Sequence, residues 1–352
     1  MKGIILHGGH GTRLGPLTQS IPKQLLPIAN KPMSQYALED LRNANIFDIA
    51  IVIGDVYPEK VKNFYNDGSN FGVHISYIYQ DHPKGIAHAI SLCKDFVGND
   101  DFVVYLGDNI MRKNLCSFEK QFSNSDSDSM ILVSEVTEPS RFGIAEFDNK
   151  KLTKIIEKPK NTISNLAVIG IYFFKSNVFP IIEKLKPSWR NELEVTDTLQ
   201  LMLEGGFKID VGTVTGWWKD TGTPKDIIDA NNLILNTLGD SDQLLNDKKI
   251  STSKIVIDSE TIVDQDSIIE EPVIIGKNCK IINSKIGPNV SIGDNSIIQN
   301  SILKNSVIMN NCHIEGNISF DDSIIGSNSI IKISSSVKFT ELLLGDSSKI
   351  KI

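Results

Sequence analysis

Short apolar runs alternate with amphipathic stretches along the first two thirds of the chain. The runs predict buried strands, and apolar positions spaced three or four apart predict helices. The helix expected at 34–44 begins with Ser34 as its N-cap, two residues after Pro32. Such alternation predicts a mostly parallel sheet with helices on both faces, and ligands on such sheets bind beyond the carboxyl ends of the strands. The predicted strands are 3–7, 48–53, 74–79, 102–106, 130–136, 142–147, 167–174 and 208–214, and the predicted helices are 34–44, 58–66, 85–96 and 195–204.

A different pattern fills the last third of the chain, where an apolar residue recurs every six positions. A helix face has a period of 3.6 residues, so a period of six suits a parallel β-helix, in which each coil has short flat sides with one inward side chain per side. The pattern slips in phase twice. Its positions are Val256, Ile262, Ile268, Ile274, Lys280, Ile286, Ile292 and Ile298, then Ile302, Ile308, Ile314 and Phe320, then Ile324 and Ile330, with Gly276, Gly287, Gly293, Gly316 and Gly326 near the turns.

The chain length and a polar segment between the two patterns predict two domains. The chain has 352 residues, which suits about two domains of ordinary size. Residues 236–252 are polar and rich in turn-forming residues, as expected of a connection. We therefore expect domains at 1–237 and 238–352.

Composition and charge narrow the class of protein. Hydrophobic residues make up 40% and charged residues 22% of the chain, as in ordinary globular proteins. The net charge of -7 argues against a nucleic-acid partner. No apolar run is long enough for a membrane span, and the N-terminus lacks a signal-peptide profile. The four cysteines are widely separated, which predicts reduced thiols and a cytoplasmic location.

The most informative motif follows the first predicted strand. It reads Gly8-Gly9-His10-Gly11-Thr12-Arg13-Leu14 and is followed by Pro22-Lys23-Gln24. Glycines let backbone N–H groups approach an anion, and the two cations neutralise its charge. The dinucleotide fingerprint fails because Leu14 stands at the third glycine position, and no Gly-Lys-Ser/Thr of an ATPase loop is present. A tight turn is the alternative, and the pair of cations favours an anion site.

Two aspartates follow candidate strand ends. Asp108 lies in Gly107-Asp108-Asn109, where its carboxylate suits Mg²⁺ or stabilises its own turn. Asp220 precedes Thr221-Gly222-Thr223-Pro224, where it suits a second metal ligand or caps the following helix. The pair is informative only if the fold brings both carboxylates together.

Other polar residues carry weaker signals. Lys158 suits a sugar phosphate and Glu157 suits sugar hydroxyls, with an exposed charged turn as the alternative. Gln80 suits a base edge and Gly85 permits close approach, with an ordinary helix entry as the alternative. No histidine is spaced from another histidine or a cysteine like a metal site, and His88 is expected to be structural.

Together these motifs resemble the sugar-phosphate nucleotidylyltransferase family. The closest likeness is to its thymidylyl-transferring members with a C-terminal left-handed β-helix, and the resemblance covers nearly the whole chain. The blocks that match in order after the glycine loop are 106–109, 141–143, 157–159, 167–172, 192–197, 219–222 and 341–346.

The resemblance implies a fold and a reaction. The fold is a Rossmann-like, mostly parallel α/β nucleotidyltransferase domain followed by a left-handed parallel β-helix. The reaction is Mg²⁺-dependent, direct in-line transfer of a nucleotidyl group from dTTP to glucose 1-phosphate, with pyrophosphate as the second product. UTP in place of dTTP is the alternative, and a homo-oligomer is expected.

The resemblance also implies roles for residues of this chain. The catalytic residues are Arg13, Lys23 and Lys158, and the metal ligands are Asp108 and Asp220. The nucleotide-binding residues are Leu6, Gly8, Gly9, Gly11, Thr12, Arg13, Gln24, Gln80 and Gly85. The residues for the sugar phosphate are Asp108, Gly143, Glu157, Lys158 and Tyr172.

Two departures and two alternatives complete the predictions. His7 stands where the family usually has a small residue, and Gly15 stands where it commonly has Arg. A hexapeptide-repeat acyltransferase is one alternative, either alone or as a bifunctional enzyme with sugar acyltransferase activity in the β-helix, and His313 is its sole candidate catalytic histidine. An interaction protein that resembles translation exchange-factor subunits is the other, and the intact set of cations and carboxylates favours an active enzyme.

Overall fold

The computed structural model describes residues 1–9, 11–112, 115–238, 249–252, 254–339 and 341–351. The chain forms two compact units. The first unit consists of Met1–Gly9 and Ser34–Asp220, and the second unit consists of His10–Met33 and Thr221–Ile352. The domain boundary after residue 237 stays a prediction. Most of the connection expected at 236–252 lies outside the described residues.

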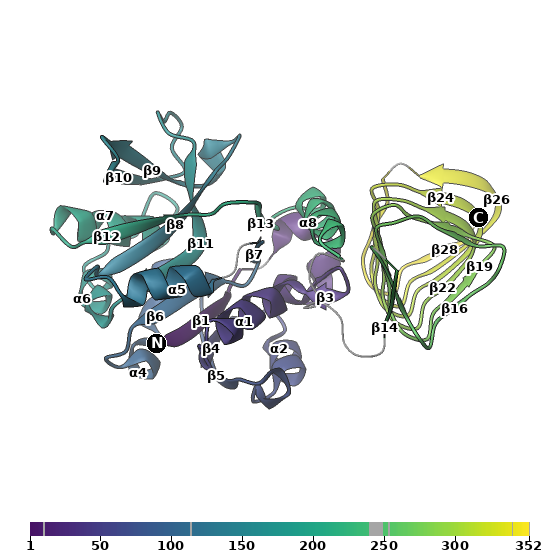
Figure 1. Cartoon of the computed structure of the whole chain (residues 1–352), viewed down its shortest axis with the longest axis horizontal. Helices are drawn as coiled ribbons and strands as arrows, with labels where there is room; N and C mark the ends of the chain where they lie inside the picture. The colour runs from purple at the N-terminus through teal and green to yellow at the C-terminus, as the bar shows by residue number, and fades with distance from the viewer. Residues whose placement is uncertain (10, 113–114, 239–248, 253, 340, 352) are drawn as a thin grey trace. The chain divides into compact units, whose positions relative to one another are not determined.

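Parallel strands form one half of the sheet in the first unit (Figure 1). β1 pairs in parallel with both β4 and β6, and β4 pairs in parallel with β5. Three of the predicted strands have the bounds observed in the structure, and the first begins one residue earlier than predicted. The bounds are β1 Lys2–His7, β4 Asp48–Ile53, β5 His74–Tyr79 and β6 Phe102–Leu106.

The other half of this sheet is largely antiparallel, so the sheet is mixed. Among the described residues it has nine strands, with the order β10-β9-β11-β6-β1-β4-β5 and with β8 joining β11 to β12. β11 runs antiparallel to β6, β8 and β9, whereas β12 runs parallel to β8. The bounds are β8 Ser129–Glu135, β9 Gly143–Asp148, β10 Lys151–Glu157, β11 Leu166–Phe174 and β12 Ile209–Thr213.

The helices of the first unit confirm the expected alternation with two corrections. The helix begins at Met33, so Ser34 lies inside it rather than at its N-cap, and the Ser34 hydroxyl is hydrogen-bonded to Tyr65. The helix expected at 85–96 is two helices, because the N–H of Cys93 turns back to the Ile90 carbonyl at 2.9 Å. The bounds are α1 Met33–Asn43, α2 Pro58–Tyr65, α3 Ile86–Ser91, α4 Lys94–Val97, α5 Cys116–Ser123, α6 Phe179–Ile182 and α7 Val195–Glu204.

A parallel β-helix makes up most of the second unit, and Figure 1 shows its stacked coils in green to yellow. Ile255 pairs with Val273, and Val290 pairs with Ser306, which are steps of 18 and 16 residues per coil. The strands are β14 Lys249–Thr252, β15 Ile255–Asp258, β16 Ile262–Val263, β17 Ile268–Ile269, β18 Val273–Ile275, β19 Lys280–Ile282, β20 Lys285–Ile286, β21 Val290–Ile292, β22 Ile297–Leu303, β23 Ser306–Ile308, β24 His313–Phe320, β25 Ile324–Ile325, β26 Ile330–Phe339, β27 Leu343–Leu344 and β28 Lys349–Lys351.

The six-residue period is confirmed, but its inward phase was wrong in several coils. Ile262 and Ile268 are 60% and 56% exposed, and the residues that follow them pack on the interior. Lys280 is exposed, whereas Ile281 is fully buried in the interior cluster. Most sides of the coils carry two adjacent apolar residues. A pattern shifted by one residue is therefore apolar as well, although the shift exchanges the inward-facing and outward-facing side chains. The same shift applies at Ile302 and Ile330, whose following residues Leu303 and Ile331 are the buried ones.

Asparagine, more than glycine, forms the turns of the β-helix. Asn278, Asn295, Asn311 and Asn328 all have positive φ, a conformation that asparagine tolerates better than most residues. Their side chains form a column in which each Nδ2 donates to the Oδ1 of the next coil at 3.1 to 3.2 Å. The repeated hydrogen bond therefore joins one coil to the next outside the apolar interior.

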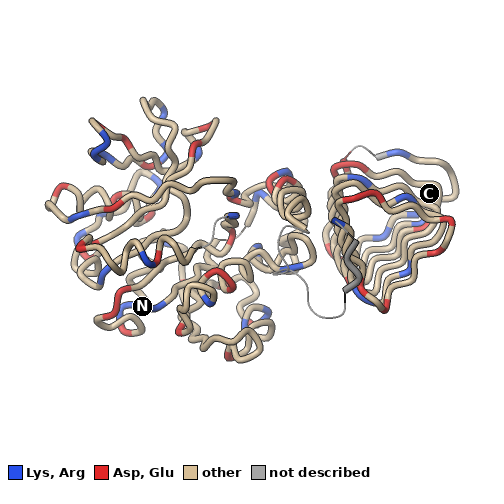
Figure 2. Tube along the Cα trace, in the orientation of Figure 1, with Lys and Arg blue, Asp and Glu red and all other residues tan. Residues whose placement is uncertain are grey.

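The second unit also contains a helix and a hairpin. α8, Pro224–Asn236, begins with a capping box between Thr223 and Asp226. β2, Pro27–Ile28, pairs with β3, Lys31–Pro32. Figure 2 shows Lys and Arg interspersed with Asp and Glu along both units. In the part of the chain that the structure describes, no helix combines the length and apolar character that a bilayer span requires.

Candidate functional site

The carboxyl ends of four parallel strands meet at one edge of the sheet in the first unit. β1, β4, β5 and β6 run in the same direction, so the residues that follow them lie at that edge. Gly8 follows β1, Gln80 follows β5, and Asp108 lies two residues beyond β6. The structure therefore brings these three predicted site residues to one edge of the sheet.

Asp108 and Asp220 come together through a two-stranded pairing. β7, Asn109–Met111, runs antiparallel to β13, Trp218–Asp220, and Asp220 lies opposite Asn109. The buried Asn109 fixes this pairing, because its Oδ1 accepts hydrogen bonds from the Trp218 indole at 2.7 Å and from the Gly170 N–H at 3.2 Å. Its Nδ2 donates to Asp108 Oδ1 at 2.9 Å. The pairing thus sets Asp220 opposite the residue that follows Asp108, so two positions far apart in the sequence are neighbours in the fold.

The alternative role of Asp220 as a helix cap is excluded. Thr223 is the N-cap of α8, and its hydroxyl accepts a hydrogen bond from the Asp226 N–H. Asp220 instead ends β13. Asp108 does contact its own turn, because it accepts the hydrogen bond from Asn109, so the turn-stabilising role named as its alternative is observed.

The two carboxylates suit a metal that is shared with a phosphate substrate. Mg²⁺ usually takes one or two carboxylates and completes its shell with water and phosphate oxygens. Within the described residues, no group of three His, Cys, Asp or Glu side chains is arranged to hold a metal. The donor set therefore fits a substrate-assisted metal site better than a site made by protein ligands alone.

Gln80 lies at the same edge and is held by His88. Gln80 is 5% exposed, and its Nε2 is 2.9 Å from His88 Nδ1. A side chain at Gly8 would lie 3.3 Å from Gln80 Oε1, so the glycine lets the amide stand against the backbone of the loop. Gly85 has φ +103, and a Cβ there would lie 2.4 Å from the Leu193 carbonyl oxygen. The close approach that Gly85 permits in the structure is therefore to the Leu193 backbone.

His7, the first departure from the family pattern, ends β1 inside the protein. It is 5% exposed, and its ring lies edge-on to Tyr65 at 6.0 Å. Neither ring nitrogen has a hydrogen-bond partner among the described residues. Burial lowers the pKa of His7 to about 3, although the charge of Asp108 raises it in part. His7 is therefore a neutral, buried side chain next to the loop.

Two predicted site residues belong to the hydrophobic core instead of an open surface. Leu6 and Tyr172 are 6% and 4% exposed, and both pack in the main core cluster. The Leu6 carbonyl accepts a hydrogen bond from the Gly107 N–H at 3.0 Å, which fixes the start of the turn that carries Asp108. Burial raises the pKa of the Tyr172 hydroxyl, and the charges of Glu157 and Asp108 raise it further.

Glu157, Lys158 and Gly143 lie together at the end of a strand pair. Glu157 ends β10 opposite Gly143 at the start of β9. The Thr196 hydroxyl donates to Glu157 Oε2 at 3.1 Å, and Lys158 Nζ lies 3.4 Å from Glu157 Oε1. A Cβ at Gly143 would lie 2.6 Å from Thr196 Cγ2, so the glycine is required for this contact.

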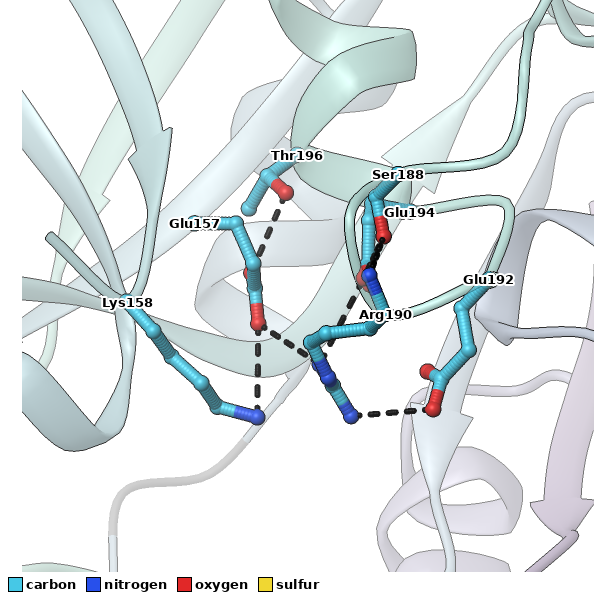
Figure 3. A network of polar contacts seen from close by, with 7 residues as sticks. All are labelled: Glu157, Lys158, Ser188, Arg190, Glu192, Glu194 and Thr196. Atoms are coloured by element: carbon cyan, nitrogen blue, oxygen red, sulfur yellow. Dashed lines mark hydrogen bonds and ion pairs between the residues drawn. The ribbon is translucent and has the colours of Figure 1, made fainter.

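Arg190 is a functional candidate that the sequence reasoning missed. Its guanidinium contacts three carboxylates, at 3.2 Å to Glu157, 3.0 Å to Glu192 and 3.4 Å to Glu194, as Figure 3 shows. Burial raises the pKa of Glu194, and the Arg190 charge counteracts this. The available signal was its place two residues before the recognised block at 192–197. From sequence alone, an arginine in a polar stretch suggests a solvent-exposed loop residue. Only the fold shows that three carboxylates surround it.

The glycine loop continues into the second unit. Gly9 has φ +97, and His10 lies outside the described residues. Gly11 has φ +61 and precedes a 3₁₀ turn at Thr12–Leu14. A Cβ at Gly11 would lie 2.9 Å from Thr18 Cγ2, so the turn closes on the segment that follows it. The loop therefore requires glycine at position 11.

The cations and Gln24 occupy short 3₁₀ turns. Lys23 and Gln24 begin the turn Lys23–Leu25 and are 8% and 1% exposed. Arg13 is exposed, and a side chain at Gly222 would lie 3.2 Å from its Nη2. Gly222 is two residues after Asp220 in the sequence. Glycine at position 222 thus gives the Arg13 guanidinium room next to the backbone.

The fold is an α/β unit whose sheet edge gathers glycines and carboxylates, together with a unit built mainly of a parallel β-helix. The nucleotidyl transferase family model matches residues 2–237, and the GMPPB C-terminal domain model matches residues 282–351. The chain therefore belongs to the nucleotidyl transferase family.

Named relatives extend over different parts of the chain. A glucose-1-phosphate thymidylyltransferase of Streptomyces griseus is 35% identical over 100% of this chain and 99% of its own length. The low-salt glycan biosynthesis nucleotidyltransferase Agl11 of Haloferax volcanii is 50% identical over 67% of this chain, and the match spans 66% of that relative.

Two solved structures are similar to about two thirds of this chain. A Bacillus anthracis protein assigned as a glucose-1-phosphate thymidylyltransferase and solved with sucrose is 43% identical, with a TM-score of 0.64 over 66% of this chain and 94% of that one. A UDP-glucose pyrophosphorylase solved with UDP-glucose is 29% identical, with a TM-score of 0.60 over 67% of this chain and 98% of that one.

Proposed function

We propose that this protein transfers a thymidylyl group from dTTP to glucose 1-phosphate and releases pyrophosphate, with dTDP-glucose as the product. The full-length relatives named glucose-1-phosphate thymidylyltransferase support the reaction. The observation that carries the proposal is the pairing of β7 with β13, which sets Asp220 opposite Asn109, the residue that follows Asp108. Two carboxylates near each other suit Mg²⁺ that is shared with the phosphate oxygens of a substrate, which is what this reaction uses.

The chemistry needs charge stabilisation more than acid–base catalysis. A phosphate oxygen of glucose 1-phosphate attacks the α-phosphorus of the triphosphate and forms a new P–O bond. The bond between the α-phosphorus and the bridging oxygen breaks, and the pyrophosphate leaves with that electron pair. The nucleophile is already an anion, so no protein base is required. The obstacle is the repulsion of two polyanions, and fixed positive charges lower it.

The residues divide this task. We assign Arg13 and Lys23 to the charge of the triphosphate and of the departing pyrophosphate. Lys158 and Arg190 flank Glu157, and we assign these cations to the sugar phosphate and Glu157 to the sugar hydroxyls. Asp108 and Asp220 would hold Mg²⁺, which when bound supplies positive charge at the phosphate oxygens.

For the nucleoside we assign the edge residues around the loop. Gln80, already fixed by His88, presents its amide to the base, and Gln24 serves the same base. Backbone N–H groups at Gly8, Gly9, Gly11 and Thr12 face the phosphates. These assignments follow the resemblance residue by residue.

UTP is the second candidate donor. One similar structure is a UDP-glucose pyrophosphorylase with UDP-glucose bound. Uracil lacks only the thymine methyl, and one methyl group in an apolar pocket is worth about 1–3 kcal/mol of discrimination. We expect dTTP to be preferred because the relatives that match over the full chain carry the thymidylyl name.

The proposal also includes where the protein is located in the cell and whether it forms oligomers. The four cysteines are free, and Cys93, Cys279 and Cys312 are buried. Free thiols suit a reducing compartment, so we propose a cytoplasmic enzyme. We also propose a homo-oligomer, which light scattering of the purified protein would measure directly.

The test is a matrix of pyrophosphate release from five nucleoside triphosphates against several sugar 1-phosphates. The expected result is that dTTP with glucose 1-phosphate has the highest kcat/KM and UTP the second highest. No pyrophosphate release with any pair would overturn the proposal, and a higher kcat/KM with UTP would replace the donor.

A metal titration tests the carboxylate assignment. Asp108→Asn removes one ligand charge, so the Mg²⁺ concentration at half-maximal rate should rise about tenfold or more, in line with charge-assisted ligand interactions. Asp148→Asn, an exposed aspartate in the same unit, is the matched control and should leave the titration unchanged. An unaltered titration in Asp108→Asn would remove Asp108 as a ligand.

A further inference from the structure

One outer face of the β-helix is buried although its side chains point away from the interior. Val290 and Ile292 belong to the interior cluster, so the intervening Ser291 points outward, yet it is 0% exposed. The residues at the same register in neighbouring coils, Val307 and Ile324, are each 1% exposed. Something other than the coils therefore covers this face.

α8 and the β2–β3 hairpin supply that cover. Asn231 of α8 is fully buried, and its Oδ1 accepts hydrogen bonds from Ser291 Oγ at 2.9 Å and from the Ala29 N–H at 3.0 Å. Asn30 Nδ2 donates to the Ile292 carbonyl at 2.7 Å. A cavity of about 250 Å³ lined by residues of α8 and of the coils at 322–324 and 341–343 lies along the same contact. One asparagine thus joins the helix, the hairpin and the β-helix.

The hairpin tip has a conformation that its sequence does not favour. Ile28 pairs with Lys31, so Ala29 and Asn30 form a two-residue turn, with φ of 46° and 63°. Both central residues of such a turn need positive φ, which suits asparagine and glycine and strains alanine. The hydrogen bonds to Asn231 and Ile292 hold this strained tip against the β-helix.

A second attachment lies at the far end of the same sheet of coils. Ser20 Oγ donates to Asp346 Oδ2 at 2.5 Å, and Asp346 Oδ1 accepts from the Ser327 N–H of the adjacent coil at 2.8 Å. A side chain at Gly345 would lie 3.0 Å from the Pro16 carbonyl oxygen, so the two backbones are in direct contact. The two attachments are three ladder steps apart, from β21 to β27, or roughly 14 Å.

We propose that the β-helix is a positioning platform for the cation segment, which we define as residues 11–33 with Arg13 and Lys23. The segment is held at Pro16–Ser20 and at Ala29–Asn30, and the two cations lie before and between these attachments in the sequence. Asn231 and Asp346 are its positioning residues. The inference that this platform sets the affinity for the triphosphate rests on the proposed function.

The experiment measures hydrogen exchange of peptides from 11–33 in the full-length protein, together with steady-state kinetics. Asn231→Ala and Asp346→Ala should each speed amide exchange in the segment about tenfold, because each removes hydrogen bonds that hold one attachment. The KM for the triphosphate should rise by a similar factor, and the KM for the sugar phosphate should stay unchanged. If these residues only stabilised the fold, the KM for the triphosphate would not rise while the KM for the sugar phosphate stayed unchanged.

Asn311→Gly is the matched control. It removes two hydrogen bonds of the same kind between coils, from Asn295 to Asn311 at 3.2 Å and from Asn311 to Asn328 at 3.1 Å, and glycine tolerates the positive φ. Exchange in the segment should stay at the wild-type rate. Faster exchange in this control, equal to that in Asn231→Ala, would overturn the proposal, because it would reflect general loosening of the β-helix.

Ser20→Ala keeps the proposal testable if the buried Asn231→Ala variant fails to fold. It removes the Asp346 contact from the segment side and leaves the coils intact, so exchange near residues 16–20 should increase. If both Ser20→Ala and Asp346→Ala exchanged at the wild-type rate, the platform proposal would be overturned. Because exchange needs no substrate, failure of the proposed reaction in the nucleotide matrix is distinguishable from failure of the platform.

Discussion

The sheet edge of the first unit and the coils of the second unit use polar side chains in opposite ways. At the edge each contact joins a different pair of residue types: Gln80 contacts His88, and Asp108 contacts Asn109. In the coils the same bond is made repeatedly, as from Asn295 to Asn311 at 3.2 Å. A contact that is made once cannot be replaced by another copy of itself, whereas each hydrogen bond of the column is one of several equivalent bonds. Changes at residues assigned to chemistry should therefore affect the reaction, and changes in the coils should affect stability.

The largest effect is expected for Arg13→Ala. Loss of a positioned cation that stabilises charge in the transition state lowers kcat by about 10³-fold, which corresponds to about 4 kcal/mol. Arg13 is exposed, so the unfolding free energy should hardly change. Steady-state turnover and a denaturant titration on the same preparation measure both quantities.

Lys62→Ala is the control for that comparison. Lys62 is a surface residue that pairs with Glu59 one helical turn away at 2.8 Å. Surface pairs of this kind contribute about 0–1 kcal/mol, so turnover should stay at the wild-type level. Equal turnover in Arg13→Ala and wild type would exclude the assigned role.

The second effect tests the corrected phase of the β-helix. Ile281 is fully buried in the interior, and removal of its side chain should destabilise the protein by about 3 kcal/mol through lost burial and a cavity. Lys280 is exposed and was the position marked by the sequence period, so Lys280→Ala should have little effect. Unfolding in denaturant compares the two neighbours. A larger loss in Lys280→Ala would restore the original phase.

The parallel strands of the first unit were predictable because each is a short, self-contained apolar run. The bounds of β4, β5 and β6 agree with the sequence pattern, since buried strands with turn residues at both ends carry a local signal. The period of the coils was predictable for the same reason. Their inward phase was not, because pairs such as Ile262-Val263 are apolar in both positions and only the three-dimensional closure of the coil selects one.

The candidate site was predictable by type and not by arrangement. Asp108 and Asp220 stood out as carboxylates near strand ends, but the pairing of β7 with β13 is a long-range contact with no local signal. Arg190 was missed because its partners lie on another strand and a neighbouring turn. Gly85 was selected because it permits close approach, and the structure adds that the Leu193 backbone lies against it, a long-range contact with no local signal.

A smaller effect is expected when one side chain of the asparagine column is removed. Asn295→Gly deletes one hydrogen bond to each neighbouring coil but tolerates the positive φ of 58°, so a loss of about 1 kcal/mol is expected. Asn295→Ala adds backbone strain and should cost about 1 kcal/mol more. Denaturant unfolding separates the two contributions, and kcat should be unchanged in both variants. A fall in kcat would contradict the division between chemistry and stacking.

The smallest effect concerns pH and the hydrogen bond between Gln80 and His88. Burial lowers the pKa of His88 below 6.5, and the charge of Lys84 lowers it further. The unfolded chain therefore takes up a proton at higher pH than the folded protein does, so the His88 contribution to stability is complete above pH 6.5. It declines as the pH falls from there toward the folded pKa.

His88→Leu removes this titration and should flatten that part of the profile. The loss of unfolding free energy between pH 7.5 and pH 5.5, chosen as about one unit on either side of the ordinary histidine pKa, should be smaller in the variant than in wild type. Protonated His88 offers a donor where Gln80 Nε2 already donates, so the contact is lost with the same proton. An identical pH profile in the two proteins would mean that neutral His88 does not hold Gln80. The role assigned to this contact at the sheet edge would then be excluded.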